Sequence, residues 1–72
     1  MADPNQREID RLLARFADAQ EERIVWGNKM LMLTYAKKTD SPEYREAFRR
    51  ANAAHNNIQD IRAQLRRYGI DV

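Results

Sequence analysis

The stretch "KKTDSPEY", Lys37 to Tyr44, divides the chain into two halves and decides its fold. Ser41 followed by Pro42 is typical of a helix start, because a serine hydroxyl can cap the first turn and proline suits the first helical position. Lys37 and Lys38 suit a helix C-terminus, where positive charge meets the negative end of the helix dipole. The stretch therefore ends one helix and begins another.

The outer ends of both helices are also marked. Asp3 is a suitable N-cap, and Pro4 follows it at the first helical position. Near the end of the chain, Gly69 fits the left-handed position that closes many helices. A Schellman cap there would pack Ile70 against Leu65. Two start signals and two stop signals predict two helices.

We therefore expect an all-α fold with one helical-hairpin domain over 1–72: a helix at 4–38, a turn at 39–41 and a helix at 42–68. A connection this short makes the helices antiparallel neighbours. The chain has 72 residues and no cysteine, so a lone hairpin has a marginal core without disulfides. We expect two hairpins to associate into a homodimeric four-helix bundle.

The second helix follows a heptad repeat. Its apolar seam consists of Tyr44, Ala47, Ala51, Ala54, Ile58, Ile61, Leu65 and Tyr68. The alanines near the turn allow the backbones to approach closely. The hairpin register then places Gly27 against Ala51, so we expect Gly27 to serve close helix packing, and it places Leu31 near Phe48.

The first helix carries more apolar residues than one neighbouring helix can cover. We assign Leu13, Ile24, Met30 and Leu31 to the core together with Ile9, Leu12 and Phe16, and we expect Trp26 and Leu33 to widen this face on one flank. Further apolar residues lie around the rest of the helix, and tryptophan and methionine are enriched at protein interfaces. We predict a protein interface, with a second copy or with a target, formed by Val25, Trp26, Met30, Met32, Leu33 and Ala36.

Polar residues meet in the middle of the predicted hairpin. They are Gln20, Arg23, His55, Gln59 and Arg62. We interpret them as a polar core layer that fixes register, as a polar heptad residue does in coiled coils. A ligand pocket between the helices and a catalytic site are the alternative interpretations.

The sequence offers little for catalysis or cofactor binding. His55 is the one histidine, and it lacks the second histidine or carboxylate at ligand spacing that a zinc site needs. Ser41, the one serine, is assigned to a helix cap, and no thiol is available as a nucleophile. We therefore expect no enzyme activity, no catalytic residue, no cofactor and no metal.

The second helix presents arginine and amide side chains along one side. This stripe comprises Arg45, Arg49, Asn52, Asn56, Arg66 and Arg67. Such side chains contact phosphates and RNA bases, although the net charge of +2 is too small to indicate nucleic acid by itself. An RNA- or DNA-binding regulator is thus the alternative function.

The main functional hypothesis is a small non-enzymatic protein–protein interaction module. It would act as a homodimer that binds an unidentified protein, as compact bacterial or phage adaptors and regulators do. The first residues contain no apolar leader, and no apolar run reaches the roughly 20 residues that a bilayer span needs. We therefore expect a cytoplasmic protein without a membrane partner.

Overall fold

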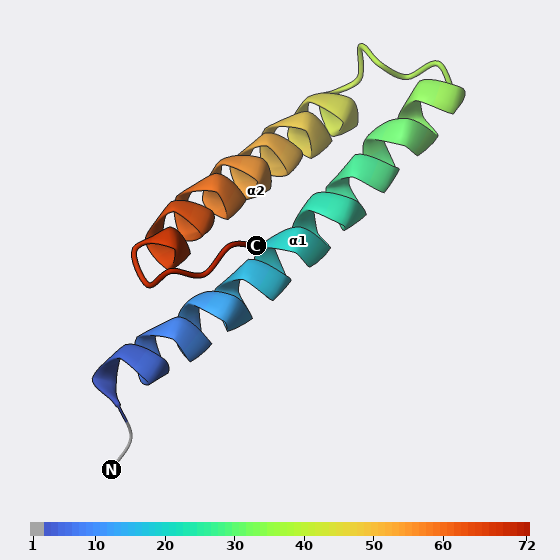
Figure 1. Cartoon of the computed structure of the whole chain (residues 1–72). Helices are drawn as coiled ribbons and strands as arrows, with labels where there is room; N and C mark the ends of the chain where they lie inside the picture. Colours follow the sequence, from blue (N-terminus) through green and yellow to red (C-terminus); the bar gives the residue numbers. More distant parts are fainter. Residues whose placement is uncertain (1–2) are drawn as a thin grey trace.

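The computed structural model describes residues 3–72 and consists of two antiparallel helices, α1 (Pro4–Tyr35) and α2 (Pro42–Arg66). They pack side by side along most of α2, and the first turns of α1 extend past the end of α2 (Figure 1). The molecule is a rod of 54 × 18 × 16 Å. The predicted all-α helical hairpin is confirmed. Within residues 3–72, neither helix has the length and apolar character needed to cross a membrane.

Both helix starts have the predicted caps. The Asp3 carboxylate accepts a hydrogen bond of 2.9 Å from the Asn5 backbone N–H, and the Ser41 hydroxyl accepts one of 3.2 Å from the Tyr44 N–H. A proline follows each capping residue. These contacts satisfy backbone donors that the first turn of a helix leaves without a partner.

The first helix ends at Tyr35 instead of residue 38, which corrects the expected boundary. The Lys38 N–H bonds the Leu33 carbonyl at 2.8 Å, and the Lys37 N–H bonds the Thr34 carbonyl at 3.0 Å. This pair of bonds is a Schellman motif, which requires a left-handed residue. Lys37 takes that conformation with φ = 58°. The connection is therefore longer than the three residues expected.

The second helix ends at Arg66, two residues before the expected boundary, because its last turn tightens. The Tyr68 N–H bonds the Leu65 carbonyl three residues back, at 3.0 Å. Beyond it, Gly69 has φ = 78°, and the Ile70 N–H bonds the Leu65 carbonyl at 3.1 Å. Ile70 also packs against the core that contains Leu65. The predicted Schellman cap is confirmed.

The heptad seam of α2 faces α1 as predicted, except that Tyr68 lies beyond the end of the helix and is 38% exposed. Its fully buried members are Ala47, Ala54, Ile58, Ile61 and Leu65. The large side chains gather toward the end of the hairpin away from the loop. There Leu12 and Ala19 complete the core, and Ile9 and Phe16 pack against it. Toward the loop, α2 contributes alanines, so the core is thinner there.

The apolar seam of α1 differs from the expected one. Leu13, Ile24 and Leu31 were assigned to the core, yet they are 38%, 61% and 51% exposed. The buried and half-buried apolar residues of α1 recur at spacings of three and four, and the exposed Arg23 falls at the same spacing. The seam is therefore Ile9, Leu12, Phe16, Ala19, Arg23, Trp26, Met30 and Leu33. The three misplaced residues each follow a seam residue, so their side chains point about 100° away from the seam.

Gly27 does not pack against Ala51. A Cβ atom built on Gly27 would meet nothing within 4 Å, and the residue is exposed. It directly follows Trp26 of the seam and so lies to one side of the contact between the helices. The helix continues through Gly27 and Asn28 without a break. The expected role of Gly27 in packing within the hairpin is therefore wrong.

Candidate functional site

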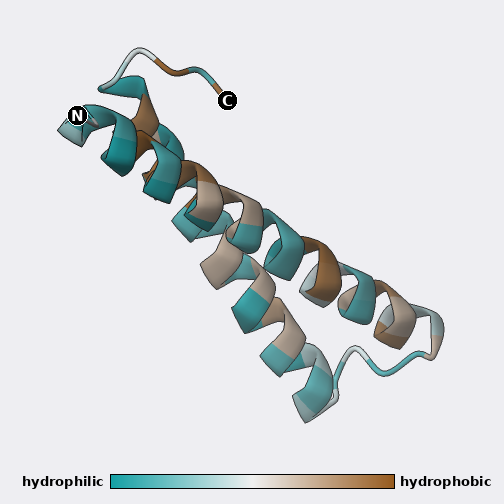
Figure 2. Cartoon of the chain, turned by 90° about the horizontal axis from the view of Figure 1, so that it is seen from below, coloured by the Kyte–Doolittle hydropathy of each residue, from teal (hydrophilic) through white to brown (hydrophobic). Residues whose placement is uncertain are grey.

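Three of the six predicted interface residues lie outside the seam of α1. Val25 and Met32 each precede a seam residue, so they point about 100° away from it, on the side of Lys29 and Arg50. Met32 is 70% and Val25 54% exposed, and Ala36 is also exposed. We call Val25, Met32 and Ala36 the outer surface. They line an open groove together with Asn28, Lys29, Leu33 and Lys38. In Figure 2 hydrophobic colour recurs along α1 out to its loop end. The outer surface is apolar, and two lysines border it.

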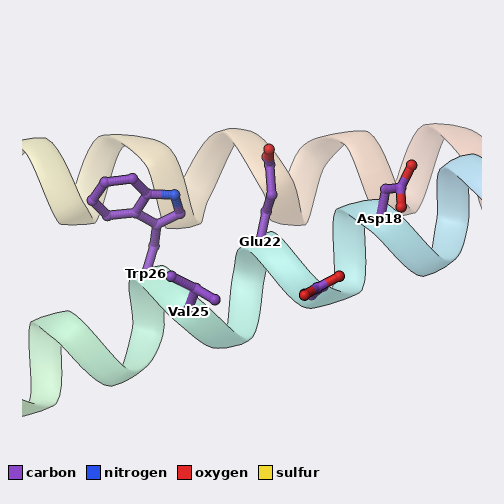
Figure 3. Close-up of a pocket in the computed structure, with 5 residues that line it drawn as sticks. Asp18, Glu22, Val25 and Trp26 are labelled. Carbon is purple, nitrogen blue, oxygen red and sulfur yellow. The ribbon is translucent and has the colours of Figure 1, made fainter.

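The other three, Trp26, Met30 and Leu33, occupy seam positions and are half-buried within the chain. The indole of Trp26 rises from α1 toward α2 (Figure 3). The Arg50 guanidinium carbon lies 4.9 Å from the centre of the ring, and the Lys29 ammonium nitrogen lies 5.4 Å from it. Such cation–π contacts stabilise an aromatic side chain at a partly exposed site. Trp26 therefore supports the hairpin itself.

A shallow hollow beside Trp26 carries acidic side chains. Asp18, Glu21, Glu22 and Val25 line it together with the indole (Figure 3). In residues 3–72, no group of three or more histidine, cysteine or carboxylate side chains is placed to hold a metal ion. The hollow adds negative charge to the Trp26 side of α1.

A second exposed apolar surface, which was not predicted from the sequence, lies on the opposite side of the hairpin. Arg50 and Lys29 both lie against the Trp26 ring, so they are on the same side of the contact between the two helices. Phe48 precedes Arg50 by two residues and therefore lies about 200° around α2 from it, on the other side. We call Ile24, Gly27, Leu31 and Phe48 the side patch; its three side chains are all more than half exposed. The sequence alone does not identify this patch, because apolar residues surround much of α1 and several seams fit its spacing.

The predicted polar core layer is not buried within the hairpin. Among residues 3–72 no polar or charged side chain is fully buried. Arg62 is half-buried, and its Nε is shielded without a hydrogen-bond partner in the part of the chain that the structure describes. The exposed members of the set are Gln20, Arg23, His55 and Gln59. Arg23 occupies a seam position, but its long side chain can carry the charge out to water. The other members fall outside both seams.

The six residues of the arginine and amide stripe are all exposed on α2 and just beyond it. Arg49 forms an ion pair of 3.0 Å with Glu46, and the Arg45 guanidinium donates a hydrogen bond of 3.2 Å to the Asp40 carbonyl. Glu46 also accepts a hydrogen bond from Arg50, and this bond, assisted by the charges of both arginines, lowers the pKa of Glu46. One carboxylate thus offsets part of the positive charge near the loop.

No protein-family model matches the chain, and neither does any curated protein or solved structure. The assignment of function therefore depends on the surfaces of the hairpin. Two of them, the outer surface and the side patch, are apolar, and the stripe on α2 is basic.

Proposed function

We propose that the protein is a small cytoplasmic interaction module, without enzyme activity, that acts as a homodimer of hairpins and binds another protein. The outer surface is the observation that supports this proposal. Val25 and Met32 are more than half exposed, because α2 packs on a different face of α1 and does not cover them. Contiguous apolar surface on a small protein is typical of a binding site.

The border of the outer surface indicates the chemistry of the partner. Lys29 and Lys38 line the same groove as Val25 and Met32. A partner segment with an apolar side chain followed by a carboxylate would bury the methionine and pair with Lys38, while the acidic hollow beside Val25 would repel negative charge at the other end. Methionine adapts to irregular partner surfaces because its side chain is unbranched and polarizable.

The proposal can be tested by capture of binding partners from lysate, with and without nuclease. The test variant is Val25→Lys/Met32→Lys, and the control variant is Arg45→Gln/Arg49→Gln on α2. Both pairs are exposed, so both variants should keep the helical circular dichroism of the wild type. We expect nuclease-resistant capture that is lost only in the outer-surface variant. Trp26→Ala is a poor test because it would also weaken the hairpin.

Nucleic-acid binding through the stripe is the second candidate function. It is favoured because Arg66 and Arg67 are exposed and form no ion pair among the residues described. If arginines of the stripe contact phosphates, the slope of log affinity against log salt should fall by about 0.7–0.9 for each arginine removed. Nuclease-sensitive capture that disappears in the Arg45→Gln/Arg49→Gln variant would replace the first proposal with this one.

A further inference from the structure

We infer that a second copy of this chain packs on the side patch, so that the homodimer forms there and not on the outer surface. This inference depends on the proposed homodimer and identifies its interface. Three features of the hairpin support it: the total exposed area, the position of the patch across both helices, and the exposed glycine.

The hairpin exposes more surface than a compact protein of its size. Its accessible surface is 5623 Å² at a mass of 8.5 kDa. The scaling for folded monomers gives about 4,650 Å² at this mass, so the excess is about 1,000 Å². A standard protein–protein interface buries about 800 Å² on each partner. One further copy of the same rod is enough to cover the excess.

The side patch is suited to form a bundle because it spans both helices. Ile24 and Leu31 of α1 lie on the same side of the helix contact as Phe48 of α2, opposite to Arg50. A second hairpin placed there contacts α1 and α2 together, which completes a four-helix arrangement. Val25 and Met32 lie on the opposite side of the helix contact, where α2 presents the charged Glu46 and Arg50 beside Trp26, so a copy docked there would meet charged side chains in place of Phe48.

Gly27 lies at the centre of the α1 part of the patch. It follows Ile24 by three residues and precedes Leu31 by four, so all three share one face of the helix. Glycine inside a helix is destabilising relative to alanine. Nothing in the hairpin needs its small size, since an added Cβ meets no atom within 4 Å. A partner helix that crosses at Gly27 would need the space.

Two pairs of lysine substitutions separate the side patch from the outer surface. Ile24→Lys/Leu31→Lys changes the patch, and Val25→Lys/Met32→Lys changes the neighbouring residues, which point about 100° away. All four side chains are more than half exposed, and both variants add the same charge. Sedimentation velocity over a range of concentrations measures the dimer, and circular dichroism verifies the fold. A further matched pair is Gly27→Leu and Asn28→Leu.

We expect Ile24→Lys/Leu31→Lys to weaken the dimer by about 100-fold or more while the helicity is kept. Val25→Lys/Met32→Lys should leave the dissociation constant of the dimer within a few-fold of the wild-type value. Gly27→Leu should weaken the dimer, and Asn28→Leu should not. A dimer that survives the Ile24→Lys/Leu31→Lys change, or that is lost only with the outer-surface variant, overturns the inference but keeps the homodimer. A monomeric wild type overturns both.

Discussion

At Gly27 the helix lacks a side chain in a place where the hairpin has room for one. In a monomeric background such as Ile24→Lys/Leu31→Lys, we expect Gly27→Ala to raise the free energy of unfolding by up to about 1 kcal/mol, because alanine is the better helix former. Urea denaturation of the two chains measures the difference. A loss of stability would show that the added methyl group meets a neighbour within the hairpin.

Glu46 is the residue whose titration should affect stability. Its hydrogen bond from Arg50, with the charges of Arg49 and Arg50, lowers its pKa below the ordinary value of 4.5. A lowered pKa in the folded state stabilises the hairpin above pH 4.5, and this contribution is lost as the pH falls through the folded-state pKa.

We therefore expect Glu46→Gln to melt at a lower temperature than wild type at pH 7, and the difference to shrink as the pH falls below 4.5. The effect should be small because the group is exposed to solvent. Thermal melts of both chains between pH 7 and pH 2 provide the comparison. A difference that stays constant over this range would mean that the ion pairs of Glu46 do not stabilise the hairpin.

At the scale of the element, the position of the α1 seam can be tested with two adjacent leucines. Leu12 is 1% exposed and Leu13 38% exposed. Leu12→Ala should destabilise the hairpin by about 2–5 kcal/mol, the usual range for a buried leucine, and Leu13→Ala should cost considerably less. Equal losses in chemical denaturation would place both leucines in the core and contradict the seam.

The end of α1 provides a second prediction at this scale. Lys37 holds a left-handed conformation that glycine adopts without steric cost. We expect Lys37→Gly to stabilise the hairpin by up to about 1 kcal/mol, because left-handed backbone costs an ordinary residue roughly 1–2 kcal/mol. Lys38→Gly serves as the control, since Lys38 has no positive φ. Thermal denaturation that ranks Lys38→Gly above Lys37→Gly would exclude this explanation.

For the whole molecule, the excess surface of the rod predicts melting that depends on concentration. If folding is coupled to dimer formation, the melting temperature rises with protein concentration. We expect the melting temperature of the wild type to rise over a hundredfold range of protein concentration. The melting temperature of Ile24→Lys/Leu31→Lys should stay nearly constant over the same range. A wild-type melting temperature that does not change with concentration would indicate that folding needs no second copy.

The surfaces of the candidate site could be predicted only in part. The exposed apolar residues of the outer surface and the stripe on α2 were named from the sequence, because an excess of apolar positions and a run of arginines are visible in a helical projection. The side patch and the place of Trp26 beside Arg50 were missed, since both depend on how α1 is rotated against α2.

The sequence by itself determined the number of helices, their starts, the C-terminal Schellman cap and the seam of α2. These features depend on local chemistry: Ser41 and Asp3 cap the backbone nearest to them, Gly69 adopts a left-handed conformation readily, and α2 has one narrow apolar stripe. The tertiary structure decided the rotation of α1. Apolar side chains surround much of that helix, so several rotations bury a similar area, and only packing against the single seam of α2 selects Leu12 over Leu13.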